Sequence, residues 1–371
     1  ATLARIHPGN LRHNFRVAKE RAAPARAMAV VKADGYGHGI ERVARTLAND
    51  TDYYAVACLE EAMALRAAGL LQPVLLMQGV HEAKDLQLCE SENFTVVVHD
   101  PHQLGWLEAG YGRPEVWLKV NTGMNRLGFA PAGLARVKEG LSRIGVRVTG
   151  AMTHFACADD EQSQATARQT EVFGQATAEL GDITRRVANS AAHFRVDQSL
   201  CDRTRPGIML YGSSPMLGRY GPELGLKAVM TLESRLIATR ELTPGDAVGY
   251  GETWRATRPT RMGMVCIGYG DGYPRHAVSG TPVWIRGTRV PLIGRVSMDM
   301  LAVDLGEVPE AAVGDAVELW GEHIPVDEVA ACAGDISYAL LYGVTRRAPR
   351  VGGGAAHTAV HVSALDRHGA S

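Results

Sequence analysis

Lys32 is the residue whose position best suits amine chemistry. It follows an apolar run that begins at residue 27, and Lys119 ends a similar run that begins at residue 115. The chain has six lysines and 33 arginines, so a lysine in this position is uncommon here. Loss of water around such a lysine lowers its pKa and makes the neutral amine available for imine formation. Position alone leaves open the alternative of a lysine that reaches out to the rim of the fold.

A second group of residues could bind an anion. Ser190 follows one apolar run, and the turn 205–208, Arg-Pro-Gly-Ile, lies at the next. Backbone N–H groups at Gly207 and Ile208 can point at an anion, and glycine lets the backbone approach it closely. Such a turn is common and means little alone. Combined with Lys32, these groups would hold a phosphorylated aldehyde at both ends, which describes pyridoxal phosphate (PLP).

The elements that must position these residues are eight short β-rich runs, with helical spacing between most of them. Most of the runs are almost continuously apolar, which is typical of parallel strands covered on both faces. We therefore predict an α/β fold with an N-terminal (β/α)8 TIM-like barrel, whose active site lies at the carboxyl ends of the strands. A helix at 8–21 precedes the barrel, and 60–69 and 161–181 are helical in spacing. The helix at 193–203 is short. The expected strands are 27–33, 53–59, 73–79, 94–100, 115–121, 148–155, 185–191 and 205–212.

The composition and patterning of the sequence change after about residue 226. Segments rich in Val, Thr and Ile now alternate with Gly/Pro turns, which predicts a C-terminal, mostly-β domain. We place the barrel at 1–226 and the β domain at 227–371. The expected strands are 229–241, 260–267, 281–285, 289–292, 300–305, 316–319 and 358–363, with one helix at 326–333.

The bulk composition excludes several classes of partner. There are 39 basic and 40 acidic residues, and a net charge of −1 gives no indication of nucleic-acid binding. No apolar run reaches the length of a membrane span, so we expect no membrane partner. The six cysteines are far apart and form no C-x-x-C pair, so we expect neither a metal site nor disulfides. This usage fits a reducing compartment, and we expect a cytoplasmic protein.

The run 29–39, Ala-Val-Val-Lys-Ala-Asp-Gly-Tyr-Gly-His-Gly, is similar to the PLP-lysine signature of bacterial alanine racemases. The resemblance covers nearly the whole chain. It implies a barrel followed by a β domain, interconversion of L- and D-alanine with PLP, and a homodimer with shared active sites. The other motifs follow in the order of the family at 119–129, 153–159, 189–190, 205–212, 248–254, 268–275, 294–304 and 336–349.

The resemblance also implies a role for individual residues. Lys32 resembles the lysine that holds PLP as a Schiff base and moves the α-proton on one face of the substrate. Tyr250 resembles the opposite base, which reaches the site from the β domain of the partner subunit. The other implied roles are polarising that tyrosine (His154), donating to the pyridine nitrogen (Arg205), binding the phosphate (Tyr36, Ser190, Gly207, Ile208, Tyr338), binding the substrate carboxylate (Arg126 and the backbone N–H of Met298) and lining the access channel (Tyr269, Arg275, Arg295).

Two positions, Asn121 and Gly270, strain the family pattern, and the chemical state of Lys119 is open. Asn121 stands where many relatives have Asp. Lys119 matches a lysine that is carbamylated in some members, and a plain lysine in an ion pair is the alternative. Gly270 stands where Ala is common, so we expect a slightly looser turn.

Structural roles compete with the implied ones. Tyr250 and Tyr338 could be buried tyrosines satisfied by one hydrogen bond. His154 could be structural and Met298 could fill a core.

Three other functions are compatible with parts of the sequence. An amino acid decarboxylase of the same architecture would usually place an acid at the pyridine nitrogen, where this chain has Arg205. A PLP carrier without turnover would be a single barrel, so the β domain argues against it. A broad-specificity amino acid racemase is usually exported. Assays with alanine, serine, lysine and arginine side by side would separate these functions.

Overall fold

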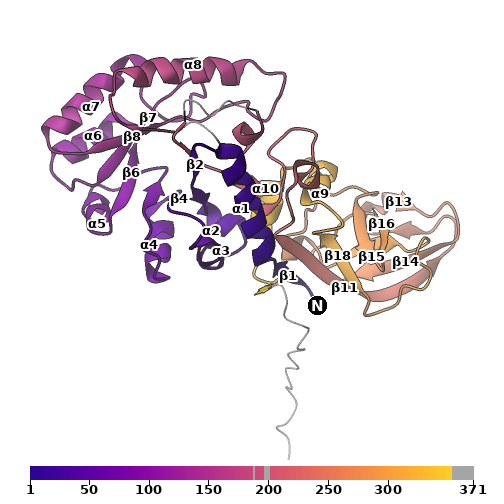
Figure 1. Ribbon diagram of the computed structural model, residues 1–371. Coiled ribbons are helices and arrows are strands. Elements are labelled where there is room, and N and C mark those ends of the chain that lie inside the picture. The colour runs from indigo at the N-terminus through magenta and orange to yellow at the C-terminus, as the bar shows by residue number, and fades with distance from the viewer. Residues whose placement is uncertain (187–188, 196–200, 353–371) are drawn as a thin grey trace, which may run out of the picture.

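The computed structural model describes residues 1–186, 189–195 and 201–352. Figure 1 shows two lobes joined side by side, with the indigo-to-magenta half of the chain in one and the orange half in the other. The first lobe contains the parallel strands and most of the helices, and the second is mainly a curled sheet. The two-part architecture predicted from the sequence is confirmed.

The first lobe is built on a curled sheet of seven parallel strands in the order β3-β4-β5-β6-β7-β8-β9. The short strand β2 (Arg26–Ala27), directly before β3, pairs in parallel with β10 (Arg203–Thr204), which brings the eighth strand against the first. The strands of the large sheet are β3 (Ala29–Val30), β4 (Tyr54–Val56), β5 (Val74–Leu76), β6 (Phe94–Val98), β7 (Glu115–Lys119), β8 (Val148–Met152) and β9 (Thr184–Arg186).

Helices between the strands cover the outside of the curled sheet (Figure 1). Strands β4, β5 and β6 are buried at every residue, as their apolar sequences predict. Helix α6 shows how the chain turns from strand to helix: Asp100 caps its N-terminus and Pro101 occupies the first turn. The helices are α1 (Pro8–Ala22), α2 (Lys32–Tyr36), α3 (Ile40–Leu47), α4 (Leu59–Ala67), α5 (Asp85–Ser91), α6 (Pro101–Glu108), α7 (Leu134–Arg143) and α8 (Ala165–Ala178).

The prediction of a strand at 205–212 is wrong. The strand is the two-residue β10, and the apolar run after it forms a buried 3-10 helix, η4 (Ile208–Tyr211). Pro206 has no N–H to donate to a neighbouring strand, and a short apolar run fits a buried helical turn as well as a strand. Of the helix predicted at 193–203, the described residues contain only the end of η2 (Ala191–Phe194) and the first residue of β10, Arg203, and the stretch 196–200 lies outside the described residues.

The second lobe has an eight-stranded sheet in the order β14-β17-β16-β15-β18-β11-β1-β19. Because β14 also pairs with β11, six of these strands close into a ring. The strand β1 (Leu3–Ile6) lies between β11 and β19, so the start of the chain belongs to this sheet. The other strands are β11 (Met230–Leu242), β14 (Thr260–Val265), β15 (Pro282–Ile285), β16 (Thr288–Ile293), β17 (Leu301–Asp304), β18 (Ala316–Trp320) and β19 (Arg350–Gly352), with a small hairpin of β12 (Ala247–Val248) and β13 (Trp254–Arg255).

Two helices of the second part of the chain pack toward the barrel. The predicted helix α9 (Val326–Ala333) is present, and it is followed by α10 (Ser337–Gly343), which the sequence pattern did not indicate. In Figure 1 both lie between the two lobes. The strand predicted at 358–363 lies outside the described residues, and the domain boundary at 226 stays a prediction. In the part of the chain that the structure describes, no helix has the length and apolar character needed to cross a bilayer.

Candidate active site

One cavity of about 820 Å³ lies at the carboxyl ends of the barrel strands and extends to α9 and α10. Its volume suits a small-molecule site with room for a cofactor and a substrate. Ten of the residues predicted from the sequence line it: Lys32, Tyr36, Lys119, Arg126, His154, Ser190, Arg205, Gly207, Ile208 and Tyr338.

Lys32 does not belong to a strand, although we predicted one at 27–33, and it begins the short helical turn α2. The next residues have left-handed backbone conformations, with φ of 53° at Ala33, 53° at Asp34, 61° at Gly35 and 52° at Tyr36. The chain therefore turns sharply at the mouth of the barrel, and both Lys32 and Tyr36 face the cavity. Burial is the main factor that lowers the pKa of Lys32, as the sequence analysis predicted.

The far part of the cavity is shaped by Gly207 and its neighbours. The hydroxyl oxygen of Ser190 accepts hydrogen bonds from the backbone N–H groups of Gly207, at 2.7 Å, and of Met209, at 3.4 Å. The phenol oxygen of Tyr36 lies so near Gly207 that a Cβ on this residue would overlap it. Tyr36 stacks on Tyr211 with ring centroids 4.6 Å apart, which fixes its position. The glycine thus leaves a small space lined by two hydroxyl groups.

Tyr338 closes this part of the cavity from the other lobe. It is the second residue of α10, and its ring centroid lies 6.1 Å from that of Tyr36. Asp327, at the start of α9, accepts hydrogen bonds from the Ser213 hydroxyl, from Ser214 N at 3.2 Å and from Gly221 N at 2.8 Å. These bonds attach the loop 213–221, part of which lines the cavity, to the helices that carry Tyr338. Sequence reasoning missed both Asp327 and this loop.

The middle of the cavity is strongly basic. Arg205 is 5% exposed, donates to the carbonyl oxygen of Thr153 at 2.6 Å, and burial lowers its pKa to about 10. Burial, together with Arg205, Arg126 and Lys32, lowers the pKa of Lys119 to about 7. Burial and the same group of cations lower the pKa of His154 to about 2, so this histidine is neutral at physiological pH. A cavity with this charge suits a ligand that carries several negative charges.

Asn121 organises the loop that leads to Arg126. Its side-chain oxygen accepts hydrogen bonds from the backbone N–H groups of Gly123, at 3.1 Å, and Asn125, at 3.0 Å. Its side-chain nitrogen donates to the side chain of Asn125 at 2.9 Å. Asparagine can make both kinds of bond, whereas the aspartate common in the family could only accept.

The remaining predicted residues lie in the second lobe and do not line the cavity of the same chain. Tyr250 is 72% exposed at the start of η6 (Tyr250–Glu252), and the Arg295 guanidinium lies beside Gly251. Tyr269 begins η7 (Tyr269–Asp271), and its N–H donates to the carbonyl oxygen of Ser297 at 3.1 Å. The Arg275 guanidinium lies 5.9 Å from the centre of the Tyr269 ring, and Met298 is 53% exposed. The buried roles considered for Tyr250 and Met298 are therefore wrong for the single chain.

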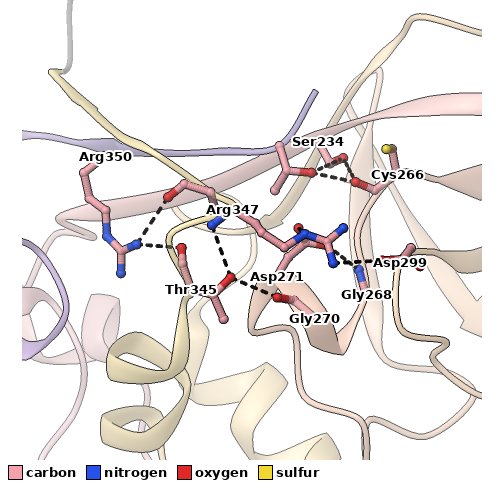
Figure 2. A network of polar contacts seen from close by, with 11 residues as sticks. Ser234, Cys266, Gly268, Gly270, Asp271, Asp299, Thr345, Arg347 and Arg350 are labelled. Atoms are coloured by element: carbon pink, nitrogen blue, oxygen red, sulfur yellow. Dashed lines mark hydrogen bonds and ion pairs between the residues drawn. The ribbon is translucent and has the colours of Figure 1, made fainter.

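Arg347 fixes the loops that carry Tyr269 and Met298. Figure 2 shows its side chain between Asp271, at 3.2 Å, and Asp299, at 2.8 Å. A Cβ on Gly270 would lie 2.5 Å from a guanidinium nitrogen of Arg347, so the glycine leaves room for this arginine. The looser turn expected from Gly270 stays a prediction.

Comparison with known proteins agrees with this geometry. The family model for the alanine racemase N-terminal domain matches residues 6–215, and that for the alanine racemase C-terminal domain matches residues 229–352. The chain belongs to the alanine racemase family. Enzymes of this family are isomerases.

Similar proteins in the alanine racemase family cover almost all of the chain. A relative from Marinobacter nauticus named alanine racemase is 58% identical over 352 residues, which are 94% of this chain and 98% of the relative. The crystal structure of the biosynthetic alanine racemase from Pseudomonas aeruginosa has a TM-score of 0.89 and 45% identity, and the match covers 95% of this chain and 99% of that one. The alanine racemase of Bartonella henselae, solved with covalently bound pyridoxal phosphate, has a TM-score of 0.85 and 26% identity, with 95% and 99% covered.

Proposed function

We propose that this chain interconverts L- and D-alanine with PLP held on Lys32, and that Tyr250 of the partner subunit supplies the second base. The observation that carries the proposal is a single cavity with a half-buried amine, a space between two hydroxyl groups beside Gly207, and a basic interior. The named relatives support alanine as the substrate.

The residues of the cavity fit PLP. Tyr36, Ser190, Tyr338 and the backbone at 207–208 would hold the phosphate, and the fixed cation of Arg205 would face the pyridine nitrogen. PLP, when bound, withdraws negative charge from the α-carbon of the amino acid. Burial lowers the pKa of Lys32, which favours the neutral amine that would bind the cofactor and move a proton.

A racemase must take a proton from one face of the substrate and return one to the other. Lys32 would serve one face. Tyr250, exposed on the second lobe, can serve the other only if that face of the lobe covers the cavity of a second subunit, so we propose a homodimer with shared sites. The neutral His154, which lines the cavity, would donate its ring N–H to the phenol oxygen of the partner subunit's Tyr250 and so favour the deprotonated form of that tyrosine.

The same dimer would complete the substrate site. Arg126 would bind the carboxylate from the barrel side, and the backbone N–H of Met298 of the partner subunit from the other. The partner subunit's Tyr269, Arg275 and Arg295 would line the access channel. Lys119 would carry a carbamate, because an amine whose pKa is about 7 is partly neutral and reacts with CO2 near physiological pH.

We also propose a cytoplasmic location, because six free thiols are typical of proteins in a reducing compartment.

Circular dichroism of L-alanine incubated with the protein tests the activity. Lys32→Ala and Tyr250→Ala should each lower the rate by at least about a hundredfold. The exposed Tyr111, outside the site, provides a matched control as Tyr111→Ala. Loss of optical activity for serine, lysine or arginine at similar rates would favour a broad-specificity racemase, and release of CO2 a decarboxylase.

Mixing the two inactive variants tests the shared site. A dimer of one Lys32→Ala subunit and one Tyr250→Ala subunit has one site with both bases intact only if each site takes its tyrosine from the partner subunit. Co-expression should therefore restore roughly a quarter of the wild-type sites. No recovery from dimers shown by mass spectrometry to be mixed would refute this part of the proposal.

A further inference from the structure

The turn after Lys32 is held in an unfavourable backbone conformation. Ala33, Asp34 and Tyr36 are not glycines, yet all three have φ between 52° and 53°. Side chains of L-residues clash with the backbone in this region, so such a turn persists only where its surroundings hold it. Lys32 projects from the first residue of this turn, so the direction of its amine depends on what holds the turn.

Glu61 holds it. This half-buried residue of α4 accepts a hydrogen bond from the N–H of Ala33 with one carboxylate oxygen and from the N–H of Ala57 with the other, both at 2.7 Å. Ala33 follows Lys32 directly, and Ala57 follows β4, the strand that pairs with β3. One carboxylate thus ties the left-handed turn to the end of the neighbouring strand. Hydrogen bonds to an ionised acceptor are among the stronger ones.

We propose that Glu61 is a positioning residue for Lys32, which fixes the turn from which the amine enters the cavity. The inference rests on the proposed function, because it concerns the capture of PLP by Lys32. Glu61 itself does not line the cavity, so it would act through Lys32 and not on the cofactor.

The charges around Lys32 give Glu61 a second effect. Burial, Arg126 and Arg205 lower the pKa of Lys32, and Glu61 opposes these two cations. Lys119 and the neutral His154 also lie near Lys32. Removal of the negative charge of Glu61 should therefore lower the pKa of Lys32 further. If the turn after Lys32 loses its position, PLP capture should weaken. If Glu61 loses its charge, the pH dependence of PLP capture should shift.

Three variants separate these effects. Glu61→Gln removes the charge and leaves one oxygen to accept one of the two N–H groups. Glu61→Asp keeps the charge but withdraws the carboxylate by one methylene. Glu60→Gln, at the exposed neighbouring position on α4, is the matched control. The full-length protein would be stripped of PLP, supplied with it again across the neutral and alkaline pH range, and its Kd measured by absorbance. Borohydride reduction and peptide mass spectrometry would then locate PLP on Lys32.

We expect Glu61→Gln to raise the Kd for PLP at least about tenfold. Its capture profile should also move to lower pH, whereas Glu61→Asp should weaken capture with a smaller pH shift. Glu60→Gln should match the wild type. A folded Glu61→Gln protein with a wild-type Kd and pH profile would overturn the inference, even if its melting temperature fell. If Glu61→Gln does not fold, wild-type capture by Glu61→Asp would overturn it. Wild-type protein that captures no PLP on Lys32 would instead refute the proposed function.

Discussion

Replacing Gly207 with alanine is expected to weaken PLP binding by at least about tenfold. The new Cβ would lie 3.2 Å from Cζ of Tyr36 and would overlap the phenol oxygen of that residue. Tyr36 cannot easily move aside, because it is buried and its ring stacks on Tyr211. Overpacking of this kind costs about 1–3 kcal/mol. Because the displaced hydroxyl is a proposed phosphate contact, much of this cost should appear in PLP binding.

Equilibrium dialysis with absorbance detection would measure the Kd of Gly207→Ala. The matched control is Gly140→Ala in α7, where a Cβ would meet nothing within 4 Å. The control should bind PLP normally and gain up to about 1 kcal/mol in free energy of unfolding, because alanine favours the helix.

A double-mutant cycle isolates the contact with the hydroxyl group. In a Tyr36→Phe protein that atom is missing, so the added penalty of Gly207→Ala should shrink by about 1 kcal/mol. A Kd within twofold of the wild type for Gly207→Ala, or an equal penalty in both backgrounds, would show that our reasoning about this space is incorrect.

Two further predictions concern stability. In PLP-free protein without bicarbonate, Lys119→Met should raise the free energy of unfolding at about pH 6, and the gain should shrink toward about pH 10. The reason is that burial lowers the pKa of Lys119 to about 7 in the folded chain. Below this pH the folded chain bears the full cost of a buried charge. Above it the folded lysine is neutral while the unfolded lysine is still protonated, so this cost falls as the pH rises. Urea unfolding at the two pH values checks this, and a gain that is constant or grows with pH would contradict it. Asp327→Ala should lower the free energy of unfolding by about 2 kcal/mol, because it leaves the N–H groups of Ser214 and Gly221 without an acceptor. Asp335→Ala, at an exposed site, is its control, and an equal loss in both variants would count against the role of Asp327.

The sequence predicted ten of the residues that line the cavity, and the reason is the geometry of a barrel. The carboxyl ends of parallel barrel strands meet at one mouth, so Lys32, Lys119 and His154 converge even though they are far apart in the chain. The same argument placed Ser190 and Arg205 correctly although the strand assigned to 205–212 was wrong, since the residues around Pro206 occupy the mouth in either conformation.

The local shape of the site was not predictable in the same way. Ala33 and Asp34 show no preference for left-handed backbone, and what holds them is Glu61, a residue 28 positions away from Ala33. On α4, Glu61 looks like any exposed acid of a surface helix. Tyr338 was placed in the site by resemblance, while the short helix that presents it is too brief to show a period.

The position of β1 bears on how the protein is made. Its residues 3–6 are synthesised long before its partners in the sheet, β11 and β19, which follow more than 220 and about 340 residues later. The barrel can therefore fold during translation while β1 is still an unpaired strand. During this time Ala4 and Ile6, which are buried in the complete fold, remain exposed. A gene fragment that ends near residue 226 would leave this edge permanently open and should aggregate unless the four residues are also deleted. Dividing the protein into two functional pieces would require moving its first strand to the second piece.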